Sequence, residues 1–395
     1  MSMLSLPEAI GRLLDSARVL ADTQTVPLRE SLGRVLAEDV VAGIDVPPAD
    51  NSAMDGYALR HHDWPGPEQP LPVSQRIIAG AVPQALAVGT AARIFTGAEI
   101  PAGADLVVMQ ENCRAEEGSV RVLELPQVRA NIRPRGQDIK SGSVVLKAGR
   151  RLKPQDLGLI ASLGFAKVTA RRRLRAAVIS TGSELVEPGE EAGPGQIYNS
   201  NRYMLAGLLQ AWGFEVLDFG IAEDNRDVIA DVMTRAGRDA DVIITSGGVS
   251  VGEEDHVKPV VESLGRLDLW RVAIKPGKPF AFGDVAGTPF LGLPGNPVSA
   301  LVTILVIARP YLFACQGIAD GAITPLEQTA LFDHKGSARQ EYLRARMTPK
   351  GVEVYSKQSS GVLFSASWGD GMVVQAPGQD IVRGGPADFI PWSFF

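Results

Sequence analysis

The segment DVIITSGGVSVGEEDH, residues 241–256, is the strongest indication of how this 395-residue chain folds. Its first five residues are typical of a buried strand, which is followed by a glycine-rich turn and then by a predicted helix over 255–264. In α/β proteins, turns of this kind at the carboxyl ends of strands bind ligands. The same pattern recurs on both sides of the segment.

Strands and helices alternate outward from this segment over residues 171–322. The predicted strands cover 176–180, 215–219, 241–245, 270–274, 280–282 and 290–293, and the predicted helices cover 201–212, 225–236, 255–264 and 297–313. This alternation predicts an α/β multidomain protein whose central domain is a doubly wound, mostly parallel sheet. We expect a helix over 5–21 plus β-rich linker and insertion domains within 1–170, and a small all-β C-terminal domain over 323–395.

The composition is that of a folded protein, with 45% hydrophobic and 21% charged residues. A net charge of −6 makes general nucleic-acid binding a poor fit, so the basic run RRRLR, 171–175, is interpreted as a strand entrance at a domain boundary. Cys113 and Cys315 lack metal-type spacing, and no signal peptide is visible. The longest apolar run, 298–308, is shorter than the roughly 20 residues of a membrane span. We expect a cytoplasmic protein without nucleic-acid or membrane partners.

Three strand-end turns carry groups that suit phosphate. STGSEL (180–185) offers hydroxyls and a carboxylate, SGGVSVGEED (246–255) offers successive backbone N–H groups, and LPGNP (293–297) opens a helix with a rigid N-terminus. Three consecutive acids, 253–255, beside a phosphate cradle are unfavourable unless a cation such as Mg²⁺ screens them. The alternative is that these acids only form a first helical turn favoured by the helix dipole.

A fourth segment, KPGKP (275–279), holds two lysines between prolines and indicates a small-oxyanion site, although a charged hairpin is the alternative. PADNSAMDGYA (48–58) and FTGAEIPAGAD (95–105) are polar loops, each of which is more typical of turns than of catalysis. The residues alone therefore indicate a phosphate-rich ligand, a divalent cation and a separate oxyanion site. No motif nominates a side-chain nucleophile.

Six segments, taken in order, resemble the MoeA-type molybdopterin molybdenumtransferases, a family that includes the gephyrin E domain. They are NSAMDGY (51–57), TGA (96–98), STG (180–182), SGGVSVG (246–252), PGKP (276–279) and LPGNP (293–297). The resemblance implies an enzyme of molybdenum cofactor synthesis that inserts molybdate into adenylylated molybdopterin with Mg²⁺ and releases AMP. It also implies an elongated homodimer, in which each active site pairs the α/β domain of one subunit with N-terminal loops of the other.

The resemblance further implies three groups of site residues. The catalytic group is Asp55, Thr96, Glu184, Asp224 and Asp255. Of these, Asp55 and Thr96 would come from the partner subunit, and Asp255 and Glu184 would bind the metal. The substrate-binding group is Ser180, Thr181, Gly182, Ser246, Gly247, Gly248, Ser250, Pro294, Gly295, Asn296 and Pro297. The molybdate group is Lys275, Lys278, Ser299, Arg339 and Ser360.

Two alternative functions stay open at this point. One is the preceding step, adenylylation of molybdopterin by ATP, whose enzymes share the α/β domain but lack the N-terminal insertion and the C-terminal β domain. The other is a gephyrin-like scaffold role. The expected partners are adenylylated molybdopterin, molybdate and a second copy of the chain, together with other cofactor-synthesis enzymes and molybdoenzyme chaperones.

Overall fold

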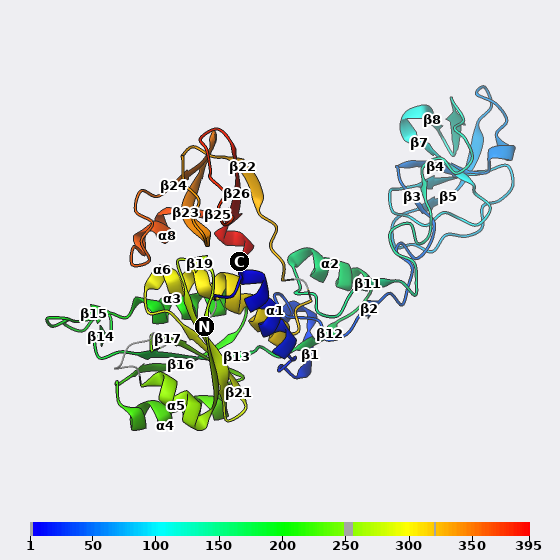
Figure 1. Ribbon diagram of the computed structural model, residues 1–395. Coiled ribbons are helices and arrows are strands. Elements are labelled where there is room, and N and C mark those ends of the chain that lie inside the picture. Colours follow the sequence, from blue (N-terminus) through cyan, green and yellow to red (C-terminus); the bar gives the residue numbers. More distant parts are fainter. Residues whose placement is uncertain (1–2, 249–255, 320) are drawn as a thin grey trace. The chain divides into compact units, whose positions relative to one another are not determined.

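The computed structural model describes residues 3–248, 256–319 and 321–395, and the chain forms two compact units (Figure 1). Unit 1 comprises Met1–Glu38, Ala148–Lys153 and Lys167–Phe395, and unit 2 comprises Asp39–Lys147 and Pro154–Ala166. Unit 2 is thus inserted into the sequence of unit 1, in two pieces.

A six-stranded sheet forms the core of unit 1, in the order β16-β13-β17-β21-β20-β18 (Figure 1). The strands are β16 (Glu215–Ala222), β13 (Arg175–Thr181), β17 (Val242–Ser246), β21 (Thr288–Leu293), β20 (Pro279–Val285) and β18 (Gly265–Arg271). The first four pair in parallel, and β20 pairs antiparallel with both β21 and β18, so five of the six strands run in one direction and β20 runs in the other. This confirms the predicted mostly parallel sheet.

Helices cover both faces of this sheet, because its central strands are apolar on both sides. They are α1 (Leu6–Ser16), α3 (Ser200–Ala211), α4 (Arg226–Asp239), α5 (Val257–Leu264), α6 (Pro297–Thr303) and α7 (Arg309–Gln316). Alternate residues of β13 enter different cores: Val178 packs with α1, α3, α6 and α7, whereas Ile179 packs with α4 and α5. The doubly wound arrangement follows from this alternation.

The helix starts have local causes in the sequence. Ser5 and Glu8 form a reciprocal capping box at α1, and Asn199 and Asn225 accept hydrogen bonds from backbone N–H groups at the starts of α3 and α4.

The strand predicted over 270–274 is wrong in extent. The backbone N–H of Val272 donates to the Lys278 carbonyl, so the chain leaves β18 after Arg271 and forms a separate strand, β19 (Ile274–Lys275).

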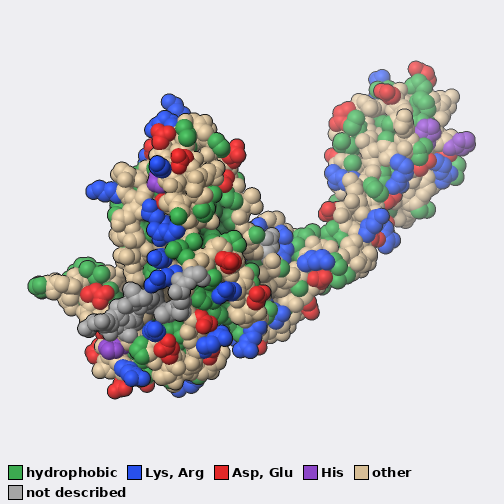
Figure 2. Space-filling model, in the orientation of Figure 1, with side chains coloured by type: hydrophobic (Ala, Val, Ile, Leu, Met, Phe, Trp, Pro, Cys, Tyr) green, Lys and Arg blue, Asp and Glu red, His purple; other side chains and the backbone are tan. Residues whose placement is uncertain are grey.

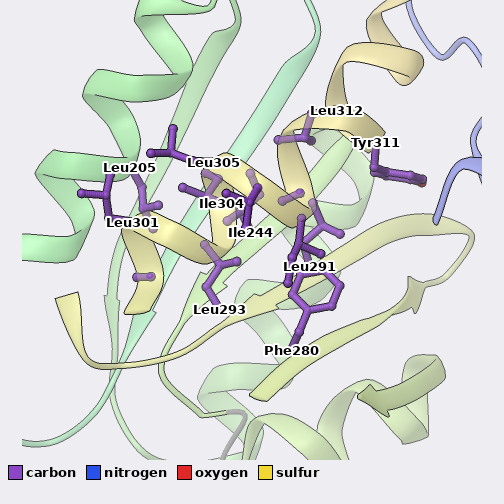
Figure 3. Packing of buried hydrophobic residues seen from close by; sticks show 14 of the residues in the cluster. Leu205, Ile244, Phe280, Leu291, Leu293, Leu301, Ile304, Leu305, Tyr311 and Leu312 are labelled. Carbon is purple, nitrogen blue, oxygen red and sulfur yellow. The ribbon is translucent and has the colours of Figure 1, made fainter. Parts of the chain in front are cut away.

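The longest helical segment, Pro297–Gln316, is formed by α6, the π-helical turn η4 (Ile304–Ala308) and α7. Its 20 residues are long and apolar enough to cross a membrane, yet 83% of its most apolar stretch is buried inside the protein. Figure 3 shows Leu301, Ile304 and Leu305 of this segment packed over Ile244 and Leu291 of the sheet. It is therefore the core helix of the α/β domain.

The C-terminal part of unit 1 forms a second sheet, in the order β19-β23-β25-β26-β22, with β24 paired to β23. The further strands are β22 (Leu326–Thr329), β23 (Gln340–Thr348), β24 (Gly351–Val354), β25 (Gly371–Gln375) and β26 (Pro386–Pro391). Its composition is nearly all β, as expected, apart from the short helix α8 (Phe364–Trp368) and the 3-10 turn η5 (Trp392–Phe394). Strand β19, which comes from the α/β segment, joins this sheet by pairing in parallel with β23.

Unit 2 contains a six-stranded sheet in the order β7-β4-β6-β5-β9-β8. Its strands are β4 (Gly56–Leu59), β5 (Leu71–Ile77), β6 (Ala91–Ile94), β7 (Leu106–Met109), β8 (Cys113–Glu116) and β9 (Ser119–Val122). Apolar side chains on both of its faces form two clusters, which confirms a β-rich insertion. The remaining elements of the unit are β2 (Val40–Val41), β3 (Asn51–Ser52), β10 (Ile132–Arg133), β11 (Val144–Leu146), α2 (Pro154–Ser162) and three-residue 3-10 turns starting at His61 and Gln110.

Three short pieces complete unit 1. Strand β1 (Thr23–Pro27) pairs antiparallel with β12 (Lys167–Arg171), and a 3-10 turn (Leu28–Glu30) follows β1. Strands β14 (Leu185–Val186) and β15 (Ile197–Tyr198) pair in parallel within the excursion between β13 and α3.

Candidate functional site

Four strand ends meet at one edge of the α/β sheet. In the register of the sheet, Ser180 of β13 pairs with Ser246 of β17, and Ser246 pairs with Leu293 of β21. On the other side, Thr181 pairs with Ala222 of β16. The turns that follow Ser180, Ser246 and Leu293 are the three predicted phosphate-type turns, so tertiary structure places them side by side at the carboxyl ends of parallel strands.

Glycines allow two of these turns to approach a neighbour closely. Gly247 has φ +91°, its N–H donates to the Leu293 carbonyl over 3.1 Å, and a Cβ at this position would lie 3.0 Å from the Thr181 carbonyl oxygen. A Cβ on Gly295 would lie 3.7 Å from the Gly247 Cα. The turns after β13, β17 and β21 therefore form one continuous backbone surface, which a side chain at 247 would disturb.

Two asparagines outside the sequence motifs, Asn199 and Asn201, complete this surface. Asn201 of α3 donates to the Gly295 carbonyl over 2.8 Å, and Ser180 Oγ donates to Asn199 Oδ1 over 3.4 Å. Thr181 Oγ1, Asn199 Nδ2 and Asn201 Oδ1 are buried and have no hydrogen-bond partner in the described part of the chain. Unpaired buried polar atoms are costly, so a polar ligand at this edge would gain from satisfying them. The signal in the sequence was the NSN triplet, 199–201, which opens the helix.

Two exposed carboxylates lie at the same edge of the sheet. Glu184 follows β13 and Asp224 follows the neighbouring strand β16; both are exposed, and neither side chain has a hydrogen bond or ion pair with a described residue. The described residues contain no group of three His, Cys, Asp or Glu that could hold a metal unaided. Mg²⁺ binds through one or two carboxylates together with phosphate oxygens, so Glu184 and Asp224 fit such an ion when phosphate is also present.

Two predicted site residues, Ser250 and Asp255, lie outside the described residues. Of the other substrate-binding residues, Ser180, Thr181, Ser246 and Pro294 are buried. Gly295 and Asn296 are exposed. In the described part of this edge, the polar residues Ser180, Thr181 and Ser246 are therefore buried, whereas Gly295 and Asn296 are exposed to solvent.

The predicted molybdate residues come together beside the start of α6. A Cβ on Gly277, between the two lysines, would lie 2.5 Å from Thr303 Oγ1 and 3.4 Å from the Ser299 carbonyl oxygen. The N–H of Val298, in the first turn of α6, donates to the Ser360 carbonyl over 2.9 Å. Arg339 Nη1 donates to the Ile274 carbonyl over 3.2 Å. Figure 2 shows several Lys and Arg side chains on the face of unit 1 where its two sheets meet.

Three further residues of this region, Glu341, His334 and Arg344, belong to none of the sequence motifs. Glu341 is buried, and both of its carboxylate oxygens lie 3.1 Å from Lys275 Nζ, while His334 Nε2 lies 3.2 Å from Oε2. Burial alone would raise the pKa of the Glu341 carboxyl, but the Ser337 hydroxyl, Lys275 and His334 together lower it below its ordinary value.

The third of these residues is Arg344, which is 1% exposed and makes no ion pair with any described carboxylate. Its guanidinium donates to the carbonyls of Tyr342 and Ser359 and to Ser365 Oγ. Burial lowers the pKa of Arg344 to about 10. Arg344 therefore anchors the 358–365 loop that carries Ser360.

Asp55 and Thr96 belong to unit 2 and contact one another. The backbone N–H and the hydroxyl of Thr96 donate to Asp55 Oδ1 over 2.8 and 2.9 Å. These two hydrogen bonds hold the pKa of the Asp55 carboxyl below its ordinary value. The pair is thus an ionised carboxylate with a fixed orientation.

Comparison with known proteins identifies family models along nearly the whole chain. Residues 4–164 match the MoeA N-terminal region (domains I and II), residues 177–314 match a probable molybdopterin binding domain, and residues 332–392 match the MoeA C-terminal region (domain IV).

Individual relatives cover most of the chain as well. A molybdopterin molybdenumtransferase of Haemophilus influenzae is 44% identical over 317 residues, which cover 80% of this chain and 78% of that protein. One of Nostoc is 35% identical over 380 residues, with coverage of 92% and 87%. The crystal structure of the molybdopterin biosynthesis MoeA protein of Pyrococcus horikoshii aligns with a TM-score of 0.86 at 30% identity, over 99% of this chain and 100% of that one.

Proposed function

Because this chain belongs to the MoeA family of molybdopterin molybdenumtransferases, which act in molybdenum cofactor biosynthesis, we propose that it inserts molybdate into adenylylated molybdopterin and releases AMP. The observation that supports this most is the pair of adjoining sites in unit 1. One is a cradle of strand-end turns, and the other is the cationic cluster of Lys275, Lys278 and Arg339 beside α6.

In this proposal the strand-end cradle binds the diphosphate of the substrate. The Gly248 N–H and the buried Thr181 hydroxyl, which has no partner among the described residues, suit phosphate oxygens. Glu184, Asp224 and Asp255 would hold a divalent cation, proposed to be Mg²⁺, which supplies charge neutralisation and orientation at the diphosphate. These residues need only position the reacting groups, since phosphoryl chemistry proceeds without a covalent enzyme intermediate when charge and geometry are arranged in advance.

The cationic cluster suits molybdate because a tetrahedral dianion needs fixed positive charge and hydrogen-bond donors. Lys275, Lys278 and Arg339 supply charge. Ser299, a buried residue in the first turn of α6, would add a hydroxyl donor. The proposal also includes a homodimer in which Asp55 and Thr96 serve the partner subunit's site, and a cytoplasmic place of action, with which the two free cysteines agree.

The test is AMP release from adenylylated molybdopterin by the purified full chain with Mg²⁺ and molybdate. We expect release well above a control without protein, and its loss in Glu184→Gln and in Asp255→Ala. Glu190→Gln is the matched control, because Glu190 is an exposed acid in the same excursion after β13 and has no proposed role. Absence of AMP release would contradict the proposal, and ATP consumption on unmodified molybdopterin would favour the adenylylation step instead.

A further inference from the structure

Lys275 and Lys278, the two lysines of the cationic cluster, differ in how they are held. Lys278 is exposed, and its side chain makes no hydrogen bond or ion pair with any residue that the structure describes. Lys275 faces Glu341, whose carboxylate oxygens both lie 3.1 Å from its ammonium nitrogen. The structure thus fixes the position of the Lys275 ammonium before a ligand binds, whereas the Lys278 ammonium has no partner among the described residues.

The carboxylate that holds Lys275 is itself fixed. Glu341 is 2% exposed and sits on β23, where it is the register partner of Lys275 in the parallel pairing of β19 with β23. His334 Nε2 lies 3.2 Å from Oε2, and a carboxylate can only accept, so this nitrogen must carry a proton to make the hydrogen bond. His334 is held in turn by reciprocal backbone hydrogen bonds with Ile381.

The side chain of Lys275 nevertheless remains open to a ligand, because it is 46% exposed. An ammonium group has three N–H donors, and the two carboxylate contacts engage at most two of them. Two further hydrogen bonds fix the backbone next to Lys275: the Gln340 N–H donates to the Ala273 carbonyl, and Arg339 donates to the Ile274 carbonyl. A donor that is oriented before binding loses less entropy when the ligand arrives.

We propose that Glu341 is a positioning residue for the oxyanion site: it holds the Lys275 ammonium in the place where that group contacts molybdate, and His334 holds Glu341. This inference rests on the proposed function and adds to it a residue that never touches the ligand. Replacement of the carboxylate by an amide would free Lys275, because an amide carries only one accepting oxygen and no charge.

The test measures molybdate binding by isothermal titration calorimetry, together with the KM values for molybdate and for adenylylated molybdopterin, on the full chain. For Glu341→Gln we expect the Kd and the KM for molybdate to rise about tenfold, which is the typical effect of one lost charge-assisted hydrogen bond. The KM for adenylylated molybdopterin and kcat at saturating molybdate should stay within about twofold.

A double-mutant cycle with Lys275→Met separates positioning from a structural role. If Glu341 acts through Lys275, then Glu341→Gln adds no further loss of molybdate binding in the Lys275→Met background. Glu353→Gln is the matched control, because Glu353 pairs with Arg346 across β23 and β24 at an exposed position, and it should leave molybdate binding unchanged. If Glu341→Gln does not fold, His334→Ala serves as the second variant, with an expected rise of about threefold in the molybdate Kd.

The outcomes are distinct. An unchanged or lowered molybdate Kd in Glu341→Gln would overturn the inference, since the carboxylate would then have only a structural role or would weaken anion binding by its charge. The inference would also be overturned if Glu341→Gln weakened molybdate binding equally in the wild-type and Lys275→Met backgrounds. A wild-type chain that binds molybdate in a Glu341-dependent way but releases no AMP would contradict the proposed function and leave this inference standing.

Discussion

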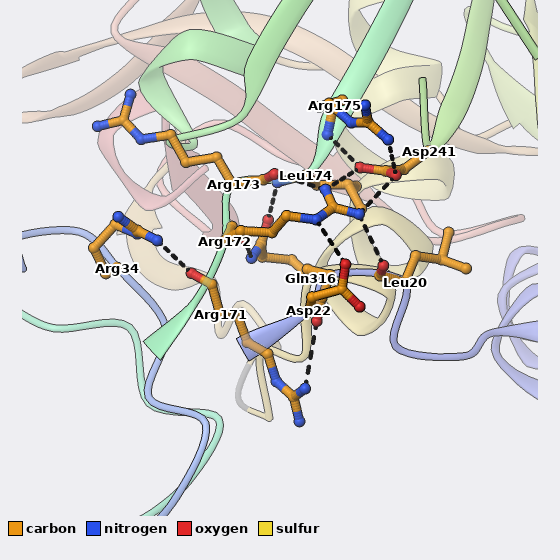
Figure 4. A network of polar contacts seen from close by, with 11 residues as sticks. Leu20, Asp22, Arg34, Arg171, Arg172, Arg173, Leu174, Arg175, Asp241 and Gln316 are labelled. Atoms are coloured by element: carbon orange, nitrogen blue, oxygen red, sulfur yellow. Dashed lines mark hydrogen bonds and ion pairs between the residues drawn. The ribbon is translucent and has the colours of Figure 1, made fainter. Parts of the chain in front are cut away.

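At the scale of single residues, Asp241 shows how a basic run becomes part of the fold rather than a binding surface (Figure 4). Its buried carboxylate accepts hydrogen bonds from Arg172 and from the backbone N–H and guanidinium of Arg175. Arg172 also donates to the Leu20 carbonyl, and Gln316 bonds to both Arg172 and Leu174 through their backbone groups. The run 171–175 therefore joins the start of β13 to two distant segments, as its interpretation as a strand entrance requires.

Asp241→Asn is expected to lower the free energy of unfolding by about 2 kcal/mol at pH 7, because it leaves two partly exposed guanidinium groups without their carboxylate. Burial alone would raise the pKa of Asp241, but its hydrogen bonds with Arg172 and Arg175 outweigh burial and lower it. A lowered pKa in the folded state contributes stability that is present above the ordinary pKa of about 4 and is lost as pH falls through the folded value.

The difference between wild type and Asp241→Asn should therefore shrink as pH falls from 5 through the acid range, which urea unfolding at several pH values measures. Asp239→Asn is the control, because Asp239 pairs with Arg238 at an exposed position and should change stability little at any pH. A constant difference between pH 7 and the acid limit would show that the ionised carboxylate is not what stabilises this junction.

At the scale of elements, the loop between β19 and β20 is held against α6 at a glycine. Gly277 has φ +111°, a conformation that L side chains rarely adopt, and an added Cβ would lie 2.5 Å from Thr303 Oγ1. Thr303 is fully buried in the core helix, so it has no room to move away. The position of Lys275 and Lys278 thus depends on a close contact that only glycine permits.

Gly277→Ala is expected to destabilise unit 1 by about 3 kcal/mol and to raise the KM for molybdate, because backbone strain and the steric clash act together. Gly287→Ala is the matched control. Gly287 also has a positive φ, +88°, but no atom lies within 4 Å of an added Cβ, so only the conformational cost of about 1 kcal/mol remains. Urea unfolding and molybdate kinetics of the two variants test this, and equal effects would show that the contact with Thr303 is unimportant.

At the scale of the whole molecule, the proposed homodimer predicts complementation between inactive subunits. Asp55→Asn would remove the carboxylate that a subunit contributes to its partner's active site. Glu184→Gln would instead inactivate the site in the subunit's own α/β domain. A heterodimer of the two variants would contain one site with both residues intact. Random assembly makes half of the dimers heterodimers, so co-expressed variants should recover about a quarter of wild-type AMP release.

Each variant assayed alone, and the two mixed without subunit exchange, are the controls for this experiment. If the mixture of exchanged subunits is as inactive as its components, Asp55 does not act across subunits. Sedimentation of the wild-type chain as a monomer would contradict the dimer itself.

Much of the architecture could be predicted, because its causes are local. Apolar strands followed by glycine turns and helices of matching length predicted the doubly wound sheet, and β17 and β21 lie within a residue or two of the expected positions. The extent of the strand expected at 270–274 was wrong, because a hydrogen bond between Val272 and Lys278 turns the chain there. No periodicity within that segment carries this information.

By itself the sequence determined which residues form the strand-end turns and, since the carboxyl ends of parallel strands share one edge, that these turns would meet. Only the tertiary structure decided that Glu341, 66 residues after Lys275, would bury its carboxylate against that lysine. The physical reason is the distance along the chain between the residues that interact. Strand and turn formation depends on neighbours along the chain, whereas the pairing of β19 with β23 depends on how two sheets pack, and that packing is fixed by contacts among residues far apart in sequence.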